Sequence, residues 1–250
     1  PSSLYGKELY SFNPQTGTSA LVKNLTSGTS NSQPREFVKS GNMAFFNLNN
    51  YLYVSDGTSS GTFKIETSPG VPYSVYKLRS LDNGLITFTA DDGIHGQEVW
   101  VSDGTLSGTK MIEDLNEGSG KSIYNQSAIN IDIFSVSNGK TWFSARGNIY
   151  STGGVAIDLE VEGVNLPDVY AYQGRVFNSY YTGTTAGREP ISAAKNSYKL
   201  IGDINPGAEA SEANSFIAID SKLFFFARDA SGIYAPYLYE FCPAEIQVTT

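Results

Sequence analysis

The sequence has little of the residue types on which cross-links and many metal sites depend. It contains one cysteine, Cys242, and one histidine, His95. A single cysteine excludes an intrachain disulfide, so the fold does not depend on oxidation. We expect Cys242 to be a small, partly buried side chain near the last hairpin. A site built on two histidines is likewise excluded, and His95 is expected to be a turn residue.

Long apolar runs and positive charge are also scarce. No apolar run approaches the ~20 residues that a membrane-spanning helix needs. Lys and Arg number 17 against 25 Asp and Glu, which gives a net charge of −8. Because such a chain repels phosphate, nucleic-acid binding and binding to anionic membranes are disfavoured, and we expect no membrane insertion.

The composition and the first residue indicate where the protein works. A cysteine-poor, acidic chain is compatible with an extracellular or cell-surface location. The sequence starts at Pro1 and shows no signal peptide. We therefore expect that a leader was removed and that the sequence is a piece of a longer protein or assembly.

Glycine, tyrosine and phenylalanine are abundant, and a repeat organises them. The chain has 25 Gly, 16 Tyr and 14 Phe, which favours strands and turns. The string EVWVSDGTLSGT at 98–109 recurs as YLYVSDGTSSGT at 51–62 and, in weaker form, as ELYSFNPQTGT at 8–18. A recurring string of this kind indicates stacked copies of one small unit.

One strand in each copy carries an aromatic or apolar register mark. The intervals between successive marks are 43, 47, 50, 41 and 48 residues, a range typical of four-stranded propeller blades. The marks are Tyr10, Tyr53, Trp100, Tyr150, Ile191 and Tyr239.

The sequence therefore predicts an all-β fold, a β-propeller of four-stranded antiparallel blades within one domain, 1–250. Five blades are predicted to be complete, and residues 8–25 form the outer half of another. The predicted blades span 32–67, 71–115, 128–160, 167–204 and 214–250. Because a propeller closes its ring to remove free edges, six blades are the first choice. A five-bladed ring with an appended hairpin, or a ring of more than six, is also compatible.

The repeated turn is predicted to be structural. Its carboxylate can accept bonds from nearby backbone N–H groups, Gly104 and Gly108 can adopt positive φ, and the hydroxyls can close the loop. A calcium site is the weaker alternative, because each turn offers one carboxylate. We expect no cofactor and no metal, including at Asp91, Asp92, His95 and Glu98. The predicted structural turn residues are Asp56, Gly57, Thr58, Asp103, Gly104 and Thr105.

One stretch carries a resemblance to a known family. The segment TFTADDGIHGQEVWVSDGTLSGT at 87–109 resembles the bacterial ELW-x-x-DGT repeat family, and GDINPG at 202–207 resembles the family's segment after the fourth strand. That family occurs in tandem in large secreted and surface proteins. The resemblance implies a propeller-like extracellular module, and it implies no catalytic residues.

Binding residues are expected at the end of the blades opposite the repeated turn. In a four-stranded meander the long loops share that end, and recognition residues concentrate on loops held by a rigid scaffold. The candidate ligand-binding residues there are Tyr124, Tyr181, Arg188, Arg228, Tyr234 and Tyr237.

These features favour a non-catalytic module for adhesion, assembly or protein–protein interaction, with a protein or a glycan at a cell surface as its partner. A lectin-like propeller that binds glycans is one alternative. A secreted hydrolase with carboxylates near the propeller axis is another, with Glu98, Asp132, Asp168 and Asp220 as candidates.

Overall fold

The computed structural model describes residues 6–28, 30–66, 74–115, 134–145, 147–162, 170–181, 187–195, 197–207 and 209–241. Its contacts divide the chain into two compact units, Pro1–Ser122 with Gly154–Ala156, and Ile123–Gly153 with Ile157–Thr250. The single domain over 1–250 stays a prediction. In the described ranges, none of the elements is a helix long and apolar enough to cross a bilayer.

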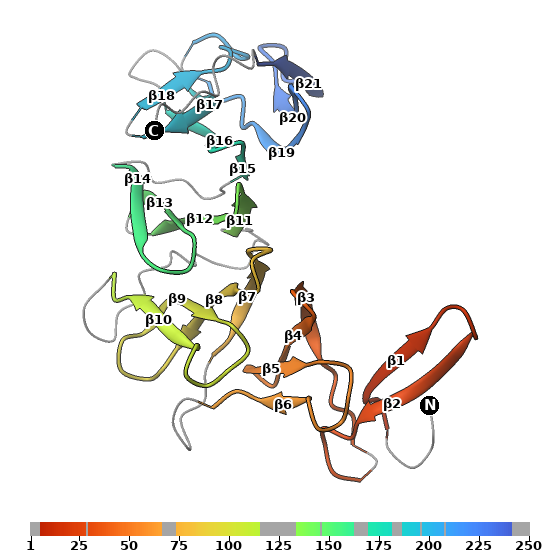
Figure 1. The fold of residues 1–250 in the computed structure, drawn as a ribbon. Helices are drawn as coiled ribbons and strands as arrows, with labels where there is room; N and C mark the ends of the chain where they lie inside the picture. Colours follow the sequence, from red (N-terminus) through yellow and green to blue (C-terminus); the bar gives the residue numbers. More distant parts are fainter. Residues whose placement is uncertain are drawn as a thin grey trace. The chain divides into compact units, whose positions relative to one another are not determined.

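Three antiparallel sheets make up the described strands of the first unit (Figure 1). The first is a pair, β1 (Leu9–Asn13) and β2 (Thr18–Lys23). The second consists of β3 (Arg35–Ser40), β4 (Met43–Leu48), β5 (Tyr51–Ser55) and β6 (Phe63–Lys64). The third consists of β7 (Tyr76–Ser80), β8 (Ile86–Asp91), β9 (Gln97–Ser102) and β10 (Lys110–Glu113).

The second unit contains the later strands. One sheet consists of β11 (Phe134–Ser137), β12 (Lys140–Ala145), β13 (Asn148–Thr152) and β14 (Ile157–Val161). The next consists of β15 (Tyr170–Tyr172), β16 (Arg175–Tyr181), β17 (Arg188–Ala194) and β18 (Ser197–Leu200). The last described sheet has three strands, β19 (Asn214–Ile219), β20 (Lys222–Arg228) and β21 (Tyr234–Glu240).

The predicted architecture is confirmed as an all-β fold of four-stranded antiparallel sheets. In every sheet the neighbours are consecutive strands. Residues 242–250 of the blade predicted at 214–250 and residues 128–133 of the blade predicted at 128–160 lie outside the described residues. The number of blades in a closed ring stays a prediction.

Both faces of the central strands are covered by side chains. All six residues of β9 are buried, although Val99 and Trp100 point to opposite faces. Trp100 stacks on Phe88 with 6.4 Å between ring centroids. The same cluster takes in Phe45 and Val54 from the preceding sheet. Val99, Trp100 and Val101 give the centre of β9 apolar side chains on both faces, while the polar residues Gln97, Glu98 and Ser102 are buried at its ends.

A buried glutamate lies two residues before the register mark in alternate copies of the repeat. Glu8, Glu98 and Glu189 occupy this position, and they are 8%, 0% and 0% exposed. Spacings of 90 and 91 residues separate them, and Tyr51, Asn148 and Tyr237 occupy the intervening copies. The chain therefore repeats every two blades at this position.

Each glutamate accepts a hydrogen bond from a backbone N–H just past the last strand of its own sheet. The donor is Leu25 for Glu8 (2.8 Å), Leu115 for Glu98 (3.2 Å) and Ile204 for Glu189 (2.9 Å). Glu189 also accepts from the Ser211 N–H at 3.1 Å. The carboxylate thus ties the connection that leaves each sheet back to the next-to-last strand of that sheet.

We expect Glu189→Gln to destabilise the second unit by about 1–3 kcal/mol, because one of the two backbone N–H groups would face an amide that also donates. The control is Glu212→Gln, an exposed partner of Arg228, which should change stability by less than ~0.5 kcal/mol. Urea unfolding followed by Trp142 fluorescence in a Trp100→Phe background measures both. Equal effects of the two changes would contradict the role of Glu189.

Candidate functional site

The repeated turn closes on its own carboxylate. Asp103 Oδ1 accepts from the Thr105 N–H at 2.8 Å and from the Thr105 hydroxyl at 2.7 Å. The Gly108 N–H then donates to Thr105 Oγ1 at 2.9 Å. The hydroxyl hydrogen bond from Thr105 lowers the pKa of Asp103, against a smaller opposing effect of burial. The carboxylate is therefore held ionised by groups of its own turn.

A second chain of hydroxyls anchors the turn to its strand. Thr109 Oγ1 donates to the Thr105 carbonyl at 2.6 Å. Since that uses its single proton, the 2.7 Å contact between Thr109 and Ser102 is donated by Ser102. Ser102 Oγ in turn accepts from the Gly104 N–H at 3.0 Å.

The earlier copy of the turn repeats this network. Asp56 Oδ1 accepts from the N–H and the hydroxyl of Thr58 at 2.8 and 2.7 Å, and the Ser55–Thr62 hydroxyl contact is again 2.7 Å. The same two donors from Thr58 lower the pKa of Asp56. Thus both DGT strings form one self-contained structural turn.

The two glycines of the motif are needed for different reasons. Gly104 has φ +91°, as predicted, but Gly108 does not have a positive φ. Instead, a Cβ on Gly108 would lie 2.1 Å from Asp103 Oδ1, so the carboxylate occupies the space of the side chain. The spacing alone did not separate a backbone requirement from a steric one.

Gly104 also makes the turn a packing element of the first unit. A Cβ at this position would lie 3.3 Å from Phe45 Cζ and from Val54 Cγ2 of the preceding sheet. Gly57, with φ +90°, has nothing within 4 Å of that position. The turn at 103–108 therefore packs closely against its neighbouring sheet.

The carboxylates singled out as alternative catalytic or metal-binding groups fall in different places. Glu98 accepts from the backbone as described, and Asp220 lies in the β19–β20 turn with φ +53°. Asp132, Asp168 and Cys242 lie outside the described residues. In the part of the chain that the structure describes, no three His, Cys, Asp or Glu side chains gather as a metal site would require.

His95 lies in the β8–β9 turn and pairs with Asp92. Its Nδ1 is 2.7 Å from Asp92 Oδ2, while Asp92 Oδ1 accepts from the N–H groups of Ile94 and His95 at 2.9 Å. The hydrogen bond to Asp92 raises the pKa of His95 above 6.5. Burial acts to raise the pKa of Asp92, but the donors from His95 and Ile94 lower it overall.

The predicted binding residues fall in different surroundings. Tyr124 lies outside the described residues, and the side chain of Tyr181, the last residue of β16, is not described. The Arg188 carbonyl at the start of β17 accepts from the Ser211 N–H and hydroxyl. Tyr237 stacks on Phe225 at 5.8 Å and packs against the core cluster of the second unit.

Arg228 and Tyr234 lie together at the edge of a feature that the sequence reasoning missed. They are paired across β20 and β21. On the same side of this sheet, alternate residues of all three strands are exposed, and the middle of this side is apolar. We call it the apolar face, formed by Ile217, Ile219, Phe224, Phe226 and Leu238, which are 54%, 57%, 37%, 43% and 52% exposed.

The apolar face has the anatomy of an interface. Ile217, Phe224 and Leu238 form one row across the three strands. At one edge Lys222 and Glu240 are 3.6 Å apart, and at the other Arg228 contacts Glu212 at 3.3 Å. An apolar centre with a charged rim is typical of a surface that another molecule covers. The signal in the sequence was the run LFFFA at 223–227, which is apolar on both faces.

Solved structures share the arrangement of sheets. The eukaryotic initiation factor matches with a TM-score of 0.54 at 12% identity, over 95% of this chain and 60% of that one. Puromycin hydrolase, as the S511A mutant complexed with PGG, matches with 0.50 at 12%, over 96% and 42%. TolB from Acinetobacter baumannii matches with 0.43 at 14%, over 76% and 46%. The chain thus spans less than two thirds of each.

The chain has the β-propeller fold. The four-stranded sheets are its blades, and the repeated turn joins the third and fourth strands of a blade. At these levels of identity the likeness shows the fold alone. No protein-family model and no curated protein matches the sequence.

We expect Gly57→Ala to cost about 1–2 kcal/mol, because alanine at positive φ is strained. Gly104→Ala should cost a further ~1–3 kcal/mol, because its methyl group also overpacks Phe45 and Val54. Urea unfolding followed by Trp100 fluorescence in a Trp142→Phe background compares the two. Equal losses would show that the turn does not pack against the preceding blade.

His95 offers a direct test of the turn before β9, since it is the single histidine. Its NMR titration midpoint should lie above ~6.5 and return toward that value in Asp92→Asn. The stabilisation from the raised pKa is present below ~6.5 and disappears as the pH rises through the folded-state value. Asp82→Asn is the control, and a midpoint that Asp92→Asn leaves unchanged would exclude the pairing.

Proposed function

We propose that the chain is a non-catalytic module of the cell surface or extracellular space that acts in assembly and protein–protein interaction. The apolar face of β19–β21 carries this proposal. On its other side, Leu223, Phe225 and Ala227 are at most 3% exposed and pack inside the second unit. Both sides of this blade are thus apolar, but only the side with Leu223, Phe225 and Ala227 is buried, and the apolar face is exposed.

The polar residues of the repeat support a scaffold role. Asp56, Asp103 and Glu189 each accept hydrogen bonds from backbone or hydroxyl groups of their own blade, so the motif's carboxylates already serve the fold. The resemblance to the ELW-x-x-DGT family supports an extracellular or cell-surface location. Detection of the native protein on intact cells with an antibody tests that location.

We take a second copy of this chain as the partner on the apolar face. The edge of the face carries both signs of charge side by side, at Lys222 and Glu240. In a two-fold contact the lysine of one copy can therefore meet the glutamate of the other. A blade side is also the type of surface that blades pack against elsewhere in the chain, as Phe45 and Phe88 show.

Analytical ultracentrifugation over a wide range of concentrations tests the proposal. We expect the protein to self-associate, and Leu238→Glu to raise the dissociation constant on the order of tenfold or more, because it buries an unpaired charge. Phe12→Glu makes the same type of change at a side chain of β1 that is 64% exposed, and it should associate as the parent does.

Three outcomes would overturn this assignment. A parent protein that stays monomeric throughout excludes the second copy as the occupant. If Phe12→Glu and Leu238→Glu weaken self-association equally, the contact lies elsewhere. The same conclusion follows if Leu238→Glu leaves self-association unchanged. Circular dichroism of each variant confirms that the sheets are retained.

A further inference from the structure

One side of the β15–β18 blade gathers polar side chains from adjacent strands. The strand register places Phe177, Ser192 and Lys199 opposite one another across β16, β17 and β18. Arg175 precedes Phe177 by two residues on β16, so it lies on the same side of the sheet, where Tyr172 is its partner on β15. This side therefore has a basic end beside an aromatic one.

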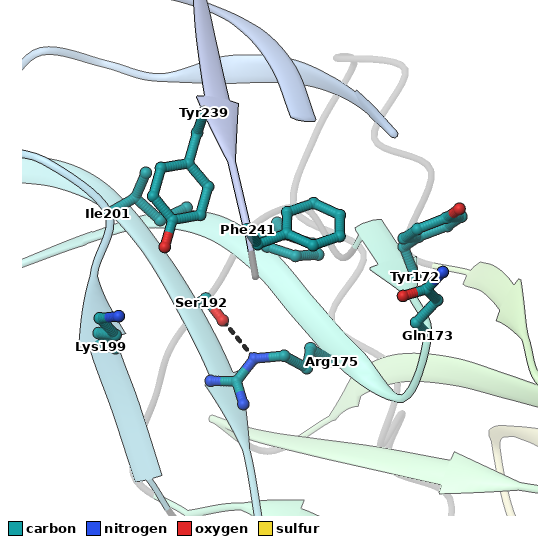
Figure 2. Close-up of a pocket in the computed structure, with 9 residues that line it drawn as sticks. Tyr172, Gln173, Arg175, Ser192, Lys199, Ile201, Tyr239 and Phe241 are labelled. Atoms are coloured by element: carbon teal, nitrogen blue, oxygen red, sulfur yellow. Dashed lines mark hydrogen bonds between the residues drawn. The ribbon is translucent and has the colours of Figure 1, made fainter. Parts of the chain in front are cut away.

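Aromatic residues from the end of β21 cover that side and leave a cavity. Phe241 stacks on Phe177 with 6.0 Å between centroids and lies 6.1 Å from Tyr172. Tyr239 completes the cover, and the cavity below measures about 220 Å³ (Figure 2). Gln173 of the β15–β16 turn lines it as well, so the cavity reaches toward the end of the blade opposite the long loops.

The charge of the cavity is unusual for this chain. Arg175 Nε donates to Ser192 Oγ at 2.5 Å, which fixes the guanidinium beside the cavity (Figure 2). Other cations of this unit, Lys140, Lys222 and Arg228, lie against carboxylates. Among the described residues, the nine that line the cavity include no Asp or Glu, although the chain has a net charge of −8. The cavity therefore favours an anion.

The shape and lining select the type of anion. The planar guanidinium matches a carboxylate, and Tyr and Phe rings provide faces for a ring-shaped ligand. Ser192 accepts from Arg175 and keeps its own proton to donate, and Gln173 adds an amide. The volume is below the ~300–1,000 Å³ of drug-sized pockets, so it suits one ring.

We propose that this cavity binds a sugar ring that bears a carboxylate, a uronic acid, with Arg175 on the carboxylate and the tyrosines against the ring. This goes beyond the proposed function, because it requires no protein partner and lies on a different blade side from the apolar face. Loss of self-association would leave it intact, and absence of sugar binding would leave the assembly proposal intact.

Isothermal titration calorimetry with four probes tests the ligand class. D-glucuronate should bind, and D-glucose, benzoate and inorganic phosphate should each bind at least about tenfold more weakly. Glucose lacks the carboxylate, benzoate lacks the sugar hydroxyls, and phosphate lacks the ring. Glucose binding as tight as glucuronate would overturn the role of the charge. Benzoate or phosphate binding as tightly as glucuronate would overturn the sugar assignment. If glucuronate at a concentration of roughly tens of millimolar gives no binding heat, the site itself is overturned.

Variants locate the site. Arg175→Gln should weaken glucuronate binding on the order of tenfold or more, and Arg175→Lys should weaken it less, because the charge stays while the fork is lost. Lys140→Gln removes a cation of the same unit that is paired with Asp158 and should bind as the parent does. Binding that survives Arg175→Gln unchanged, or that falls equally in Lys140→Gln, refutes the assignment to this cavity.

Discussion

Burying a carboxylate inside a β-blade is costly unless hydrogen-bond donors reach it, and this constraint shapes the connections that follow the blades of Glu8 and Glu189. Glu189 meets it with the N–H groups of Ile204 and Ser211, and Glu8 meets it with the N–H of Leu25 and the hydroxyl of Thr26. Each contact fixes the segment that leaves a blade against the third strand of that blade. Because the glutamate recurs in alternate copies, this link has a two-blade period, whereas the register marks recur in every blade.

The repeated turn and the glutamate use the most recognisable residues of the sequence for the scaffold. Asp103 is satisfied within its turn, and Gly104 brings that turn against Phe45 of the preceding blade. Recognition is therefore left to surfaces outside the motif. The apolar face of β19–β21 and the cavity beside Arg175 are two such surfaces, and their chemistry differs: one offers apolar rows with a mixed rim, the other a cation among aromatic rings.

The sequence was sufficient for the strands and turns because their signals are local. The register marks all fall on the third strand of a blade, or on its equivalent in β1, and the glycine at position 104 has the positive φ that its turn demands.

The sites were harder to predict from the sequence, because they depend on register across strands. Arg175 and Ser192 are distant in sequence and meet only through the β16–β17 pairing, and Tyr237 was expected at the surface although its ring stacks on Phe225. Glu98 drew attention as a possible catalytic acid, and only the fold reveals Leu115 as its donor.

Residue-resolved hydrogen exchange of the Ile204 amide tests the central claim most directly. The account predicts that this amide, which donates to a carboxylate that is 0% exposed, exchanges as slowly as the amides of the β16–β17 ladder. An exchange rate like that of the Ser231 amide, which lies in an exposed turn and donates to Asp229, would contradict the claim that buried carboxylates hold the blade connections.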